Sequence, residues 1–103
     1  MYKFSGGKYI TAAVQNDVPV ELQNRLWMMI ETMLKKKGSL DYLQIFNLEC
    51  SIKDGVRYQK ITHSQEQPQF KYSVEYISDN IIADKIYIID DVDHVTMLFS
   101  RDY

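Results

Sequence analysis

Residues 40–65, LDYLQIFNLECSIKDGVRYQKITHSQ, decide the fold of this chain. The dipeptide Asp54-Gly55 divides the stretch, and it favours the two-residue type I′ turn of a β-hairpin. A turn at this point fixes the register, so the numbers of two facing residues add up to 109. Leu48 then faces Ile61 on a mainly apolar side, and the other side carries polar and charged residues. The stretch therefore predicts a long antiparallel hairpin with one side turned toward a core.

An amphipathic helix is predicted before the hairpin, from about Pro19 to Lys37. Proline suits the first turn of a helix, and Gly38 suits the position just beyond its end. At 100° per residue, one arc of the helix collects apolar residues, namely Leu22, Leu26, Met29, Ile30, Met33 and Leu34. Two positions break this pattern: Gln23 lies inside the apolar arc, and Met28 points outward among polar residues.

Four further strands are predicted on either side of these elements. Residues 8–15 form a first strand, and residues 70–77 alternate between apolar and polar side chains. Residues 85–90 are apolar on both sides, as in a central strand, and residues 94–100 form the last strand. The order β-α-β-β-β-β-β predicts an α+β fold, with one amphipathic helix packed on a mainly antiparallel sheet of five or six strands. No repeat or linker divides the chain, so residues 1–103 are expected to form a single domain.

Several polar side chains are expected on or near the apolar side of the hairpin. In the predicted register, Gln44 faces Gln65 at the strand ends, and His63 lies on the same side. Together with Gln23 of the helix and the neighbouring Glu66, these residues are candidates for a small-ligand site. The alternative is an internal hydrogen-bond network that ties the helix to the sheet, because buried amides normally find partners.

A second candidate site is the acidic stretch IIDDVDHV at residues 88–95. Asp90, Asp91, Asp93 and His94 bring oxygen and nitrogen ligands close together, and such a set could hold a divalent cation. The alternative is a hairpin loop, in which aspartate side chains bond to nearby backbone N–H groups. The pattern D-x-D-x-V also resembles the nucleophile motif of haloacid-dehalogenase-type phosphatases. That chemistry needs a parallel sheet and later motifs, and too little chain follows for them.

Cys50 is the only cysteine, so the chain has no intramolecular disulfide and no zinc site built from several cysteines. The hairpin register places it opposite Gln59, roughly 13 Å along the strands from His63. This separation excludes a catalytic thiolate–imidazole pair. Cys50 is instead predicted to be a small buried side chain.

Charge and hydropathy exclude several classes of partner. Twelve Lys and Arg residues stand against fourteen Asp and Glu, and the net charge of -2 argues against a nucleic-acid partner. No apolar stretch has the length of a signal peptide, and none approaches the ~20 residues of a membrane span. We therefore expect a cytoplasmic protein without a membrane partner.

Four segments, VPVELQNRLWMMI, LDYLQIFNLE, ITHSQEQPQF and IYIIDDVDHVTMLFSRDY, together resemble a family of small proteins of Gram-positive bacteria known as domain of unknown function 960. The resemblance covers nearly the whole chain, with the segments in the same order. Its distinctive set is LDYLQ with H-x-Q-E-x-P and I-D-D-x-D. It implies a stand-alone, cytosolic, single-domain bacterial protein, and it supplies no catalytic residues to carry over.

These observations favour a non-enzymatic module that binds a protein partner or a second copy of itself. The outward Met28, the many tyrosines and the expected strand edges support this hypothesis. The alternative is a small-ligand or metal-binding protein, including a metal-dependent enzyme, that uses residues 90–94 or the Gln/His pocket. The sequence indicates no cofactor and no catalytic residue.

Overall fold

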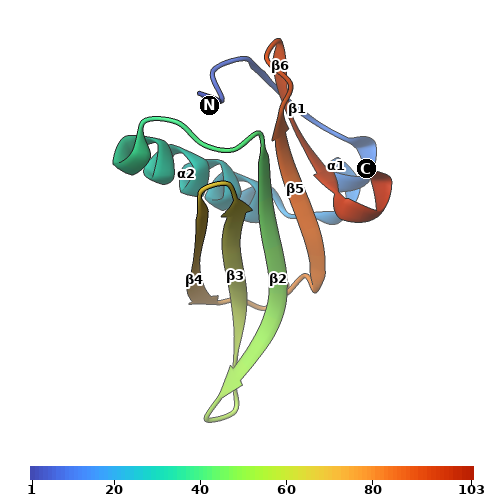
Figure 1. The fold of residues 1–103 in the computed structure, drawn as a ribbon. Helices are drawn as coiled ribbons and strands as arrows, with labels where there is room; N and C mark the ends of the chain where they lie inside the picture. Colours follow the sequence, from blue (N-terminus) through green and yellow to red (C-terminus); the bar gives the residue numbers. More distant parts are fainter.

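The computed structural model describes residues 1–103 as a single six-stranded sheet with helices on one face (Figure 1). The elements in order are β1 (Gly7–Ile10), α1 (Ala12–Asp17), α2 (Val20–Lys37), β2 (Leu43–Lys53), β3 (Val56–Glu66), β4 (Gln69–Ile77), β5 (Asp84–Asp90), β6 (His94–Phe99) and the 3-10 turn η1 (Ser100–Asp102). The order across the sheet is β1-β6-β5-β2-β3-β4, and every pair is antiparallel except β1 with β6. The predicted α+β class and mainly antiparallel sheet are confirmed.

The central hairpin has the predicted register, with Leu48 facing Ile61. Asp54 and Gly55 have φ angles of 52° and 78°, the left-handed backbone that a type I′ turn requires at both positions. Figure 1 shows that the hairpin extends well beyond the helix. Residues 49–53 at the end of β2 are exposed or only partly buried. Cys50 is exposed, so the prediction that it is buried was wrong.

The predicted first strand is too long. β1 ends at Ile10, and the following residues form α1 instead. Thr11 caps this helix, because its side-chain oxygen accepts a hydrogen bond from the Val14 backbone N–H at 3.3 Å. Val14 is fully buried, so one turn of helix brings it into the core.

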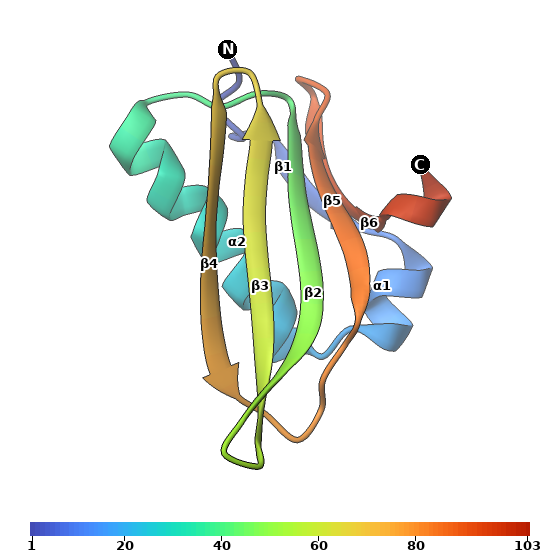
Figure 2. The same ribbon diagram turned by 60° about the horizontal axis from the view of Figure 1, so that its bottom comes forward.

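The main core lies between α2 and the face of the sheet that it covers (Figure 2). The apolar arc of α2 is buried except at Leu34, which is partly buried, and Gly38 ends the helix with φ 81° as predicted. The sheet contributes Phe46, Leu48, Ile61, Ile86, Ile88 and Met97. Each fully buried large side chain contributes ~1.5–3 kcal/mol of transfer free energy. Neither helix has the length and apolar character needed to cross a membrane.

The hairpin turn gives a first testable prediction. Replacing Gly55 with Ala places a side chain at φ 78°, and we expect the free energy of unfolding in urea to fall by about 1 kcal/mol. Gly7→Ala is the control, because its added Cβ would lie 3.5 Å from the nearest atom at an ordinary φ. Equal effects of the two substitutions would contradict a left-handed requirement at Gly55.

Candidate functional site

Three buried polar residues, His63, Gln44 and Gln65, form a hydrogen-bonded chain. The imidazole is fully buried and stacks on Phe46 with ring centroids 4.3 Å apart. Its Nε2 lies 2.7 Å from Gln44 Oε1, which can only accept, so Nε2 carries the proton. Nδ1 then accepts from the Tyr72 hydroxyl at 3.0 Å. Both ring nitrogens are therefore satisfied with the imidazole neutral.

The chain continues from Gln44 into two loops. Gln44 Nε2 donates to Gln65 Oε1 at 2.8 Å and to the Asp41 carbonyl at 2.9 Å. Gln65 Oε1 also accepts from the Asp41 backbone N–H at 3.0 Å, and Gln65 Nε2 donates to the Pro68 carbonyl at 2.7 Å. The amide groups of both glutamines thus bond within the chain and join the loop before β2 to the β3–β4 turn.

The predicted pocket residues therefore divide into two groups. Gln44, His63 and Gln65 come together, as their placement on one side of the hairpin predicted. Gln23 is buried but does not contact this group. Its Nε2 donates to the Val18 carbonyl at 2.9 Å and so fixes the junction between α1 and α2. Glu66 is exposed. The arrangement is that of an internal network.

Burial in this network lowers the pKa of His63 from 6.5 to about 3. The same cause raises the pKa of Tyr72 to about 12. Both groups are neutral across the physiological range, and the network holds without an ionic charge.

Acidification should expose the cost of this buried imidazole. The folded pKa of His63 lies below the unfolded value, so its contribution to stability is full above pH 6.5 and is lost as the pH falls toward 3. We expect the free energy of unfolding to fall by up to about 1.4 kcal/mol per pH unit across this window. Chemical denaturation at several pH values measures the slope.

His63→Gln keeps polar atoms in the network but removes the titrating group. The free energy of unfolding of this variant should therefore fall less steeply with acidification, by up to about 1.4 kcal/mol per pH unit. His94→Gln is the matched control, because that imidazole is exposed. A wild-type slope in the His63→Gln variant would contradict the assignment.

The acidic loop does not bring together all four of the residues predicted to bind a metal. Asp90 is buried, and its two carboxylate oxygens accept from the backbone N–H groups of Phe4 and Val92, each at 2.8 Å. Asp91 turns instead toward His94, with 3.4 Å between its carboxylate and the imidazole. Nowhere in the chain do three or more His, Cys, Asp or Glu side chains gather so that they could hold a metal ion. Asp90 thus anchors the N-terminal segment to the loop between β5 and β6 through these two hydrogen bonds.

Removing the Asp90 carboxylate should destabilise the protein. In Asp90→Ala the buried N–H of Phe4 and the partly buried N–H of Val92 lose their acceptor, and we expect the free energy of unfolding to fall by about 1–3 kcal/mol. Asp91→Ala removes an exposed carboxylate one residue away and should change stability by less than about 1 kcal/mol. Urea unfolding measures the stability of both variants, and similar losses would contradict the anchoring role of Asp90.

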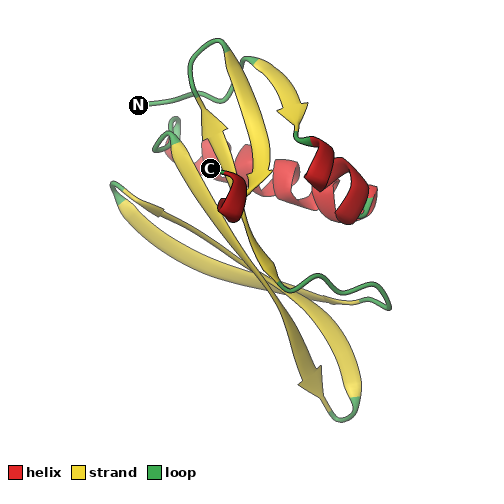
Figure 3. Cartoon of the chain, turned by 90° about the vertical axis from the view of Figure 1, so that its right-hand side faces the viewer, coloured by secondary structure: helices red, strands yellow, loops and turns green.

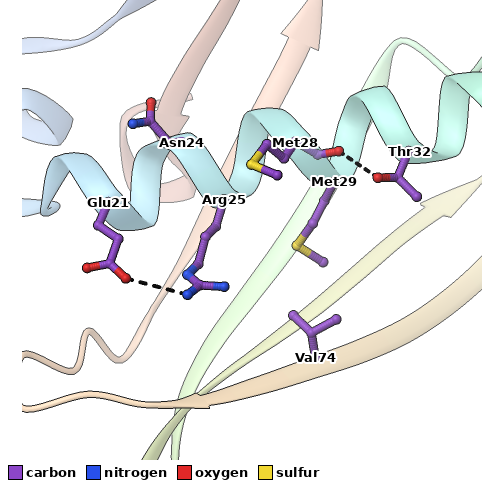
Figure 4. Close-up of a pocket in the computed structure, with 7 residues that line it drawn as sticks. All are labelled: Glu21, Asn24, Arg25, Met28, Met29, Thr32 and Val74. Carbon is purple, nitrogen blue, oxygen red and sulfur yellow. Dashed lines mark hydrogen bonds and ion pairs between the residues drawn. The ribbon is translucent and has the colours of Figure 1, made fainter.

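A groove between α2 and β4 opens on the surface, with a volume of about 470 Å³. Its lining residues are Glu21, Asn24, Arg25, Met28, Met29, Thr32 and Val74. In Figure 4, Arg25 and Met29 extend from the helix toward the strand that carries Val74. Met28 is 66% exposed and Val74 is 38% exposed, so apolar surface is open to solvent on both walls.

Arg25 gives this groove a polar anchor. Its guanidinium lies 3.8 Å above the Tyr76 ring and bonds to Glu21 at 3.4 Å. Its Nε is buried yet donates to no acceptor within the chain. A buried N–H without a partner is costly, so this part of the Arg25 side chain is held mainly by its contact with Tyr76.

The groove runs beside a free sheet edge. β4 is the last strand of the sheet and pairs only with β3, so one row of its backbone N–H and C=O groups has no partner strand. Figure 2 shows β4 as the outer strand beside β3, and Figure 3 shows how strongly the long strands twist. The sequence indicated an outward Met28 and a strand at β4, but not that this strand lies at the edge.

Comparison with known proteins shows the same family and fold. A family model described as "Staphylococcal protein of unknown function (DUF960)" matches residues 7–102. A crystal structure described as a protein of unknown function from Enterococcus faecalis is similar over 100% of this chain and 97% of that chain. Its TM-score is 0.78 and its sequence identity is 21%, a likeness that shows a shared fold. A search among curated proteins gave no match.

Proposed function

This chain belongs to the DUF960 family of staphylococcal proteins, and we propose that it is a non-enzymatic interaction module. The site of interaction is the groove between α2 and β4 together with the free edge of β4. Its ligand is an extended protein segment that adds to the edge as a further strand. In this binding mode, backbone hydrogen bonds supply affinity and pockets for alternate side chains supply specificity.

The observation that carries the proposal is the coincidence of an unpaired strand edge with open apolar surface. β4 is nine residues long, which is ample for strand addition. Met28 and Val74 line the groove directly beside it. An added strand would cover both side chains and would place side chains in the groove at every second position.

The polar groups support the same proposal. Arg25 lines the groove, and its guanidinium has N–H groups that can donate to a carbonyl or side-chain oxygen of the bound segment. The buried polar network and Asp90, in contrast, have their partners within the chain. The unpaired backbone groups of β4 and the exposed apolar side chains beside them therefore favour this surface as the binding site.

Matched charge insertions test the proposal in the native cell. Met28→Glu places a carboxylate in the groove, whereas Ile52→Glu places one at the hairpin tip, where the side chain is equally exposed (66% and 67%). We expect the tagged wild type and Ile52→Glu to co-purify the same protein, including an untagged copy of this chain if that is the partner. Met28→Glu should reduce its recovery at least tenfold, as measured by quantitative mass spectrometry.

Circular dichroism and urea unfolding serve as the folding control for both variants. If the two variants recover the partner equally, or if nothing co-purifies with the wild type, the groove is not the site of interaction.

A further inference from the structure

We propose that the segment added to β4 is the β4 strand of a second copy of this chain, paired antiparallel about a two-fold axis at Ser73. This inference rests on the proposed function and names its partner. The product is a dimer with one continuous sheet, in which both free β4 edges are covered. The order of side chains along β4 favours this pairing.

Symmetry restricts how two β4 strands can pair. A two-fold axis between adjacent antiparallel strands stands perpendicular to the sheet, so facing residues point to the same side of it. Side chains alternate along a strand, and the numbers of facing residues must therefore add up to twice the number of the residue on the axis. Only a few registers remain for a strand of nine residues.

Charge selects one of these registers. With Ser73 on the axis, Lys71 faces Glu75 of the second copy, and this pair occurs twice by symmetry. Moving the axis by one residue places Lys71 opposite Ser73 or opposite Ile77, and both ion pairs are lost. Opposite charges that face each other across strands stabilise a sheet, whereas mismatched registers lack this contribution.

Both charged side chains are available for this contact. Lys71 is exposed, and no acidic side chain of its own chain forms an ion pair with it. Glu75 is also exposed, and one of its oxygens accepts from Lys53 at 2.8 Å. The Ser51 side chain also bonds to this carboxylate. A carboxylate offers about four acceptor positions, so Glu75 can in addition accept from Lys71 of the second copy.

The groove side of β4 is complementary as well. In the same register Phe70 faces Tyr76, and Tyr72 faces Val74, each from the other copy. Aromatic side chains opposite aromatic or β-branched ones are favourable cross-strand pairs. The two-fold keeps both α2 helices on one side of the joined sheet. Met28 shares the groove with Val74, so it lies next to the axis, where the second copy would cover it.

A cysteine placed on the axis tests the register. In a Cys50→Ser background, Ser73→Cys puts two thiols opposite each other, and facing Cα atoms in antiparallel strands are about 4.5–5.5 Å apart. A disulfide spans Cα separations of about 4.4–6.8 Å, so mild oxidation should give a cross-linked dimer on a non-reducing gel. Lys71→Cys in the same background is the control, because its two thiols would lie about 13 Å apart along the strands.

Charge reversal tests the pairing in solution. Sedimentation at micromolar concentration should give twice the 12.2 kDa mass for the wild type. Lys71→Glu places a carboxylate opposite Glu75 of the second copy, and the dissociation constant of the dimer should rise at least tenfold. The double variant Lys71→Glu with Glu75→Lys restores opposite charges and should recover the dimer. Circular dichroism checks that each variant is folded.

Three outcomes overturn the inference: a wild type that sediments as a monomer, equal cross-linking at positions 71 and 73, or a double variant no better than Lys71→Glu. These outcomes are distinct from failure of the proposed function. If the protein is a monomer but still captures another protein in a Met28-dependent manner, the groove binds a partner other than a second copy.

Discussion

The register of the β2–β3 hairpin is the constraint on which the rest of the structure depends. Asp54 and Gly55 adopt left-handed backbone angles, and the turn that they form sets every facing pair along two eleven-residue strands. β2 then pairs with β5, and β3 pairs with β4, so the register passes outward in both directions. A slip by one residue would turn the apolar side of the hairpin away from α2 and the core would be lost.

The same register assembles the buried polar network. Gln44 and Gln65 meet because they face each other at the strand ends, and His63 stacks on Phe46 because these two are also a facing pair. This much followed from the sequence, since a two-residue turn determines the pairs. The closing bonds to Asp41 and the Pro68 carbonyl did not, because they depend on loop backbone that no periodic pattern describes. The network could therefore be predicted as a cluster but not as a closed one.

Other differences between expectation and structure share this physical origin. The spacing of the acidic loop suits a ligand set as well as a turn, and what decides the role of Asp90 is the N-terminal segment, which brings Phe4 against it from 86 positions away. Cys50 alternates with buried residues and so was expected inside, but the hairpin outruns the helix that would cover it. Periodicity tells which side of a strand faces a core; it does not tell how far the core extends. Periodicity does not determine the order of strands in the sheet either, and that order places β4 at the edge.

The two edges of this sheet differ in a way that bears on association. β1 is only four residues long, and short edge strands are one means by which proteins avoid pairing with other sheets. β4 offers nine residues, with no proline and no inward charge to prevent pairing. An edge protected by charge would carry like charges that repel when two copies meet. β4 carries Lys71 and Glu75 symmetrically about Ser73, so in the proposed dimer its charges would be complementary rather than repulsive.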